Sequence, residues 1–416
     1  MASTYLSRTQ TSGNRATMTA SFWIKRTGNL GEYNHIFTNS PNPGSWDTIR
    51  FDNDNQLSVR INNDSYVLKT SREFVDTSAW YHFVVTIDTT NATESDRVKI
   101  WVNGERETLF ASSTYPTLNY DTNFNLNSQT MRIGANTWAG DLTVESLQAN
   151  VSNFIWVDGT AYDADFFGEF DATTGIWKHK ASTPTFGTNG FFLKFSNSGN
   201  LGEDSSGNTN NLTVSGSPTQ IKDTPTNNWC ILNYQAQGVN RSTLSLGNLK
   251  TQSTTTTYYG TAGSIQIPTS GKWYFEFKIN TTADGGSTEG VIGVARETKY
   301  NEDQSKDEVF ETGYTQYWNG GSFSDGDIVG VLVDRAAAEV KIYKNDSLLS
   351  TKTSAIAEPY FVWTSAFGSG TNGELNTGNP HYSISSSNSD PAGLGSFEYD
   401  TKGGYAICTK NINTYG

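Results

Sequence analysis

The sequence predicts an all-β protein made of two β-sandwich domains in tandem. Short segments alternate apolar and polar residues between turns rich in Gly, Asn and Asp, which is typical of antiparallel strands. Aromatic residues make up 13% of the chain and charged residues only 17%, a composition that favours ring-filled cores over disorder. No segment keeps helical periodicity over three turns. At 416 residues the chain is long enough for two domains.

The clearest local pattern lies between Thr77 and Glu107. It predicts one strand at Trp80–Ile87 and a second at Arg97–Val102, in antiparallel order. The second segment ends at Asn103-Gly104, which favours a tight turn because both residues tolerate positive φ angles.

The first domain is predicted over residues 1–216, with Met18–Arg26 placing one apolar face inward. One short helix is predicted at Asp163–Phe170, with Asp163 as its N-cap. Leu212–Val214 is a candidate for the last strand of this sandwich. The other predicted strands are Ile49–Phe51, Leu57–Ile61, Tyr66–Lys69, Met131–Gly134, Val151–Val157 and Phe191–Phe195.

The second domain is predicted over residues 229–416, after a polar linker at 217–228. It is expected to close with a strand at Gly404–Lys410. The other predicted strands are Gly271–Ile279, Val291–Ala295, Asp327–Asp334, Glu339–Tyr343, Leu348–Leu349 and Tyr360–Ser365.

The charge balance restricts the partners. A net charge of −13 argues against nucleic acid and against anionic lipid, both of which require a basic surface. No apolar run is long enough to cross a bilayer, and the N-terminus lacks the apolar core of a signal peptide. We therefore expect no membrane insertion and folding in a cytoplasm.

The two cysteines, Cys230 and Cys408, lie in similar apolar settings that look like strands at the two ends of one domain. We expect two buried thiols, whereas a disulfide between them would need an oxidising compartment. With only 4 His and no Cys-x-x-Cys pair, a zinc site is not expected.

The first domain resembles the laminin-G-like, concanavalin-A-like jelly rolls. The matching segments are Ser21-Phe22-Trp23, Trp80-Tyr81-His82, Trp101-Val102-Asn103-Gly104, Arg132-Ile133-Gly134 with Gly140, and Val151–Val157 followed by Tyr162–Phe167. The resemblance implies a concanavalin-A-like sandwich, a fold that mainly serves binding and display.

The second domain resembles the SPRY family, again a concanavalin-A-like type of sandwich. The matching segments are Gly271–Phe277, Gly293–Ala295, Ser324–Asp334 and Lys341–Asn345. Asp346 stands where that family usually has Gly, so the turn is expected to differ in detail.

The order of these parts resembles virion proteins of tailed bacteriophages. Asp204–Asn208 lies near the end of the first domain, Asp223–Cys230 runs from the linker into the second, and the chain closes with Gly404–Asn411. The resemblance implies a non-enzymatic protein on the virion surface that attaches to a host-surface glycan or protein as a fibre or fibre-like appendage. Its expected partners are other virion proteins and further copies of itself, a trimer being one arrangement. A capsid or tail decoration protein is the alternative, and a glycan hydrolase is a third.

Calcium is the one cofactor considered, because laminin-G-like domains often bind it at a rim. Asp52 and Asp54 place hard oxygen donors in one tight turn. The competing interpretation is an ordinary hairpin turn, since Asp and Asn favour turn dihedrals.

Aromatic residues on polar loops are the candidate ligand contacts, since flat rings stack on sugar faces. Each ring could instead serve core or subunit packing. The candidates are Trp46, Trp138, Tyr314, Tyr317 and Trp318.

A hydrolase needs two carboxylates that flank one bond. The nearest candidates are Glu169 with Asp171, and Glu276, but the alternating carboxylates of such enzymes are missing. We therefore predict no enzymatic activity.

Overall fold

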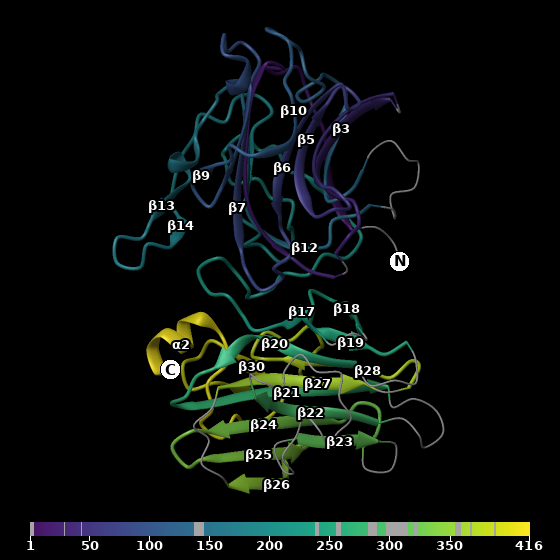
Figure 1. The fold of residues 1–416 in the computed structure, drawn as a ribbon, viewed down its shortest axis with the longest axis vertical. Coiled ribbons are helices and arrows are strands. Elements are labelled where there is room, and N and C mark those ends of the chain that lie inside the picture. Colours follow the sequence, from purple (N-terminus) through teal and green to yellow (C-terminus); the bar gives the residue numbers. More distant parts are fainter. Residues whose placement is uncertain are drawn as a thin grey trace. The chain divides into compact units, whose positions relative to one another are not determined.

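The computed structural model describes residues 4–28, 30–42, 44–136, 145–237, 241–254, 259–281, 289–296, 315–319, 323–353, 359–366, 368–386 and 388–416. The chain divides into two compact units (Figure 1). Unit 1 contains Met1–Arg26, Leu30–Val75 and Trp80–Gln220, and unit 2 contains Thr27–Asn29, Asp76–Ala79 and Ile221–Gly416.

Unit 1 is built from an eight-stranded and a six-stranded antiparallel sheet, with a separate two-stranded hairpin. The eight-stranded sheet has the order β10(Phe110–Thr114), β6(Tyr66–Glu73), β5(Gln56–Ile61), β4(Ser45–Phe51), β3(Asn34–Asn42), β11(Thr130–Ile133), β1(Tyr5–Thr9), β16(Thr213–Ser215). The six-stranded sheet has the order β15(Phe191–Leu193), β12(Ala149–Asp158), β2(Thr17–Arg26), β7(Tyr81–Asp88), β8(Val98–Val102), β9(Glu105–Arg106). The hairpin pairs β13(Gly168–Phe170) with β14(Trp177–His179).

The core of unit 1 lies between its two large sheets. Phe22 of β2 and Phe83 of β7 are cross-strand neighbours and are fully buried. They pack against Phe51 of β4, whose ring lies edge-on to Phe83 with centroids 5.8 Å apart. Alternation along each strand places these rings on one face, as the sequence predicts, and burial of such rings is the main source of sandwich stability.

The predicted helix at Asp163–Phe170 is wrong. Only a single 3-10 turn, η2(Ala164–Phe166), forms there, and the Asp163 side chain makes no capping hydrogen bond. The chain then enters β13, so Glu169 lies in a strand. Trp177 of β14 explains the outcome, because pairing Phe170 with Trp177 lets both rings pack edge to face, 4.9 Å apart.

Unit 2 is a second sandwich, of a five-stranded and a seven-stranded antiparallel sheet. The first has the order β17(Leu232–Gln237), β20(Tyr259–Ile267), β27(Tyr360–Ala366), β22(Glu289–Arg296), β23(Thr315–Asn319). The second has the order β18(Thr243–Ser245), β19(Lys250–Gln252), β28(Asn372–Asn376), β21(Lys272–Thr281), β24(Ile328–Asp334), β25(Glu339–Lys344), β26(Ser347–Thr353). A small hairpin joins β29(Asn388–Ser389) to β30(Ser396–Phe397). The prediction of two all-β sandwiches is therefore confirmed.

The predicted closing strand at Gly404–Lys410 is also wrong. Tyr405 and Cys408 make only isolated β-bridges, and the chain then forms the seven-residue helix α2(Thr409–Tyr415). No helix among the described residues is long and apolar enough to cross a membrane.

The two cysteines are buried and do not form a disulfide, as the sequence predicts. The backbones of Trp229 and Cys408 form an isolated antiparallel β-bridge, and the Cys230 backbone amide donates to the Ile407 carbonyl at 3.0 Å. Cys230 and Ile407 belong to the main core of unit 2, whereas Trp229 and Cys408 belong to a separate apolar cluster. The two thiols therefore point to opposite faces, and a disulfide requires side chains that point at each other.

Two tight turns show how Asn serves this fold. At Asn103-Gly104 the φ angles are 50° and 85°, which matches the predicted turn after β8. At Asn345-Asp346 the φ angles are 46° and 70°. Asp346 therefore adopts the positive φ that Gly would adopt, and the turn stays a two-residue hairpin rather than changing its type.

Candidate functional site

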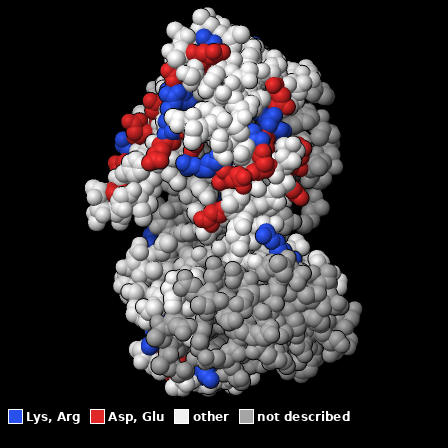
Figure 2. Space-filling model, in the orientation of Figure 1, with Lys and Arg blue, Asp and Glu red and all other residues white. Residues whose placement is uncertain are grey.

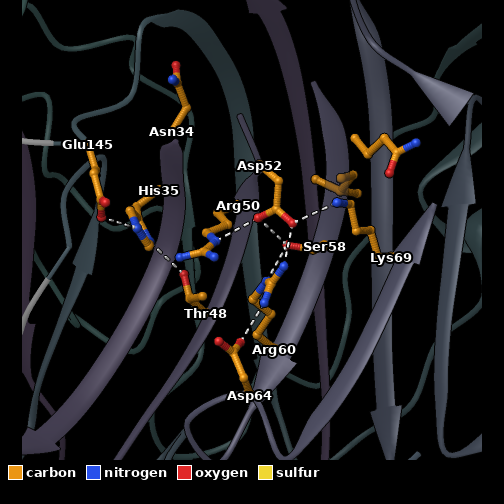
Figure 3. Close-up of polar contacts among 12 residues, drawn as sticks. Asn34, His35, Thr48, Arg50, Asp52, Ser58, Arg60, Asp64, Lys69 and Glu145 are labelled. Carbon is orange, nitrogen blue, oxygen red and sulfur yellow. Dashed lines mark hydrogen bonds and ion pairs between the residues drawn. The ribbon is translucent and has the colours of Figure 1, made fainter. Parts of the chain in front are cut away.

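The candidate site is the polar outer face of the eight-stranded sheet in unit 1 (Figure 3). Along β4 and β5, the residues Ile49, Phe51 and Val59 point into the core. The residues between them, Arg50 and Ser58, therefore lie on the opposite face. Alternation thus gives one apolar and one polar face to the same strands.

Strand register aligns these polar residues in a row across four strands. His35 of β3 lies opposite Arg50 of β4, Arg50 lies opposite Ser58 of β5, and Ser58 lies opposite Lys69 of β6. Directly opposite side chains are close enough to interact, so polar side chains from four strands share one face as a network.

Asp52, just after β4, is the centre of this network and is 1% exposed. Arg50 Nε donates to Oδ1 at 2.8 Å, and Ser58 Oγ donates to the same oxygen at 3.0 Å. Arg60 donates to Oδ2, and Lys69 Nζ lies 3.4 Å from it. Burial opposes ionisation, but the hydrogen bond and charge of Arg60 with those of Arg50 outweigh it, so the pKa of Asp52 is lowered.

His35 extends the network toward Glu145 at the other end. Its Nε2 lies 3.0 Å from Glu145 Oε2, and its Nδ1 lies 2.9 Å from Thr48 Oγ1. Burial lowers the pKa of His35, and the bond to Glu145 only partly opposes this. We therefore assign a neutral imidazole whose Nε2–H donates to the carboxylate and whose Nδ1 accepts from a hydroxyl.

The calcium prediction at Asp52 and Asp54 does not fit this geometry. Three cationic side chains already surround the Asp52 carboxylate, and Lys69 also binds Asp54. A Ca²⁺ ion needs several unoccupied oxygen ligands and would meet these positive charges. In the part of the chain that the structure describes, no group of three or more His, Cys, Asp or Glu could hold a metal ion.

The predicted aromatic contacts are not brought together on a described surface. Trp46 is wrong as an exposed ring, because it lies in β4 with 6% exposure, and the Arg50 guanidinium lies 5.7 Å from its ring centroid. Trp138 and Tyr314 lie outside the described residues. Tyr317 and Trp318 were expected on a loop but belong to strand β23, where they pair with Val291 and Gly290 of β22.

Glu276 of β21, a hydrolase candidate, is fully buried. Its carboxylate accepts five hydrogen bonds from Tyr274, Asn376, Tyr382 and the backbone amides of Glu398 and Tyr399, at 2.9–3.4 Å. Burial raises the pKa of Glu276, and these donors only partly offset it. The group therefore joins the C-terminal segment to the seven-stranded sheet and is not presented to a substrate.

Glu169 and Asp171 form a small ion-pair group on the β13–β14 hairpin. Lys178 Nζ lies 3.4 Å from Glu169 and 3.1 Å from Asp171. Asp171 also accepts the Thr173 and Thr174 amides, and the Thr174 amide is the main cause that lowers the Asp171 pKa. The Asp171 carboxylate thus serves the turn and stays ionised at neutral pH, and Glu169 shares its lysine.

The network on the eight-stranded sheet was missed by sequence reasoning. The signal was present in Gln56–Ile61, where Ser58 and Arg60 alternate with apolar residues. Three cations (Arg50, Arg60, Lys69) are balanced by three carboxylates (Asp52, Asp54, Asp64). Chemically the cluster around Asp52 is rigid and charge-balanced, Glu145 beside the neutral His35 adds one negative charge, and the rim can offer hydrogen bonds where Asp54 and Asp64 are exposed.

Figure 2 shows the same balance on the visible face of unit 1, where basic and acidic side chains are interspersed. The basic residues there do not gather into a single stripe of the kind that nucleic-acid binding requires.

Comparison with known proteins bears on the first unit most directly. A family model described as the concanavalin A-like lectin/glucanases superfamily, Laminin_G_3, matches residues 2–152. This supports the concanavalin-A-like domain predicted there. The description joins lectins and glucanases, so it includes binding proteins and enzymes.

Among solved structures, the SPRY domain of human HERC1 is similar at 12% identity. The match covers 35% of this chain and 96% of that domain, with a TM-score of 0.26. The search of curated proteins returned no match.

Proposed function

We propose that this chain is a non-enzymatic surface protein of a tailed-phage particle that attaches the particle to its host. The proposal rests on the order of the sequence motifs. A concanavalin-A-like domain comes first and a SPRY-like domain second, and the segments next to these domains also resemble those of phage virion proteins. The two sandwiches and the family match over residues 2–152 agree with this order.

One observation favours binding over hydrolysis. The buried Glu276 carboxylate accepts five hydrogen bonds from within the protein. Glu169 and Asp171 both form ion pairs with the same lysine, Lys178. A glycosidase needs one carboxyl group free to protonate the leaving oxygen and a second across the scissile bond. These candidates serve the fold instead.

The proposed mechanism is display. Rigid sheets hold polar loops outward, each contact with a host glycan or protein is weak, and many copies per particle convert weak contacts into avidity. The network around Asp52 contributes by fixing the sheet that carries the adjacent turns.

The direct test uses the purified chain, labelled, with host and non-host cells. We expect saturable binding to host cells that competes with phage adsorption. Equal binding to both cell types, or none to either, would contradict attachment. In parallel, Glu169→Gln should leave any glycan cleavage by the purified protein unchanged, and loss of cleavage would point to an enzyme.

A capsid or tail decoration protein is the second candidate. The shortness of the described helices favours it over a long fibre with a helical shaft. The longest helix in the described residues is α2, of seven residues, so the described ranges contain no helical shaft. If decoration is the role, capsids that lack the protein should open at a lower temperature than complete ones. Unchanged capsid stability would remove this candidate.

A further inference from the structure

The outer face of the six-stranded sheet in unit 1 carries an apolar cluster that is covered by one chain segment. We call residues 160–186 the strap; it includes η2 and the β13–β14 hairpin. The sheet contributes Trp23, Val84, Trp101, Ile155 and Val157 to the shared cluster, and the strap contributes Ala164, Phe167, Trp177 and Phe186.

Trp177 is the side chain that fits the strap to the sheet. A Cβ atom placed on Gly104 or on Gly168 would lie 2.3 Å from its indole ring. Gly104 belongs to the turn after β8, and Gly168 begins β13. The indole ring therefore packs directly on the backbone of both glycines. A side chain at Gly104 or at Gly168 would occupy the space that Trp177 fills.

Beneath Trp177 lies His82 of β7, which is 1% exposed. Trp177 Nε1 donates to His82 Nδ1 at 2.9 Å, and His82 Nε2 lies 2.9 Å from Ser21 Oγ. The imidazole also stacks on Trp23, with centroids 4.7 Å apart. An indole N–H can only donate, so Nδ1 must carry the lone pair and Nε2 the proton.

We propose that the strap is a pH-dependent cover, closed while His82 is neutral and released when His82 Nδ1 takes up a proton. Protonation at Nδ1 would place two N–H donors against each other at 2.9 Å, inside an apolar cluster. Release removes Trp177 from this contact and lets solvent reach Trp23 and Trp101.

The surroundings of His82 favour its neutral form. Burial, with a smaller contribution from the charge of His179, lowers the pKa of His82 to about 3. The elements nearest His82 carry other titratable side chains. These are Tyr81 and Asp88 on β7, Lys25 and Arg26 on β2, Lys99 on β8 with its partner Asp163, His179 on β14, Lys178 with Glu169 and Asp171 on the hairpin, and Tyr162, Asp165 and Lys180 elsewhere in the strap.

The direction of the pH effect follows from linkage. Because the pKa of His82 is lowered in the closed state, the released state takes up the proton first. The stabilisation from neutral His82 is complete above about pH 6.5, the ordinary histidine pKa, and is lost as the pH falls toward the closed-state pKa. Between pH 7 and pH 5 the ratio of released to closed strap should rise by about 20-fold.

Hydrogen exchange of the intact chain tests this cover. Amide protection in residues 160–186 is compared at pH 7 and pH 5 after correction for the intrinsic exchange rate. We expect strap protection to fall by about 20-fold. Protection of β4 and β5 should not fall with it, because the raised pKa of Asp47 in β4 acts in the opposite direction. Unchanged strap protection, or an equal loss throughout unit 1, would overturn the proposal.

Variants separate the latch from general packing. His82→Asn offers an oxygen in place of Nδ1 and cannot titrate, so its strap protection should not change between the two pH values. Trp177→Phe keeps a ring but removes the donor, so protection should be lower at pH 7 and respond less to acid. Trp101→Phe, in the same cluster, should respond like the natural chain.

A pH response that persists in His82→Asn would overturn the proposal. If His82→Asn does not fold, the comparison of Trp177→Phe with Trp101→Phe decides, and equal pH responses in these two variants would also overturn it. These measurements do not depend on the proposed attachment function.

Discussion

Buried carboxylates determine much of this protein's structure at the scale of single residues. Glu276 connects the seven-stranded sheet to the C-terminal segment, and Asp52 connects three strands of the eight-stranded sheet. A carboxylate that is buried and fully hydrogen-bonded stabilises one arrangement, because losing any donor leaves a charge uncompensated.

Glu276→Gln should lower the free energy of unfolding by about 2–4 kcal/mol, because the new amide N–H₂ would face donors that now bind an oxygen. Glu169→Gln, at an exposed position, is the matched control and should change it by less than about 1 kcal/mol. Chemical denaturation of both variants makes the comparison. Similar stabilities would show that the Glu276 bonds do not support the fold.

Asp47 of β4 gives a pH-dependent prediction. It accepts hydrogen bonds from the Asn62 and Asn123 amides at 2.8 and 2.6 Å, and burial raises its pKa to about 6. The folded state therefore binds the proton more tightly than the unfolded chain does, so this group adds stability as the pH falls from 7 toward 4.

The measurement compares the natural chain with Asp47→Asn at pH 7 and pH 4.5. The stability difference should shift by about 2 kcal/mol in favour of the natural chain at the lower pH. Asp165→Asn, at an exposed carboxylate of the same unit, is the matched control. A shift of the opposite sign would mean that the Asp47 pKa is not raised.

At individual sites the sequence predicted less than it did for the fold. Trp46 lies among polar residues in the sequence, but its strand alternation places it under Arg50. Asp52 reads as a turn residue, yet Arg60 and Lys69 converge on it from two later strands. These contacts depend on register between strands, which local sequence does not specify.

At the scale of elements, Trp177 tests how the strap is seated on the sheet. Gly104 has φ +85° and its added Cβ would meet the indole ring, whereas Gly175 has φ +69° and nothing within 4 Å. Gly175→Ala should cost about 1–2 kcal/mol for backbone strain alone. Gly104→Ala should cost about 3 kcal/mol or more, because displacement of Trp177 is added.

Thermal unfolding of the two glycine variants provides the check. Equal costs would mean that Trp177 does not pack on the turn as the structure shows.

Strands with clean alternation were predicted well and polar ones were not. Met18–Arg26 corresponds to β2, and Leu57–Ile61 lies within β5. By contrast β28 is Asn372–Asn376, with a single aliphatic residue, and it forms between β19 and β21 because its neighbours supply the pairing. Tertiary context of this kind overrides local propensity.

At the scale of the whole molecule, the composition anticipated the architecture. Few charges and many rings indicated two sandwiches, and each unit has a large buried core that contains several aromatic rings. The attachment function is inferred from the order of the domains, a property of the whole chain rather than of any one site.

Imaging of intact phage particles with gold-labelled antibodies against this chain tests the central claim most directly. The account predicts label at regular positions on the outer surface of purified particles, and blocked adsorption to the host when the same antibodies are bound. Purified particles that carry neither the label nor the protein would contradict it.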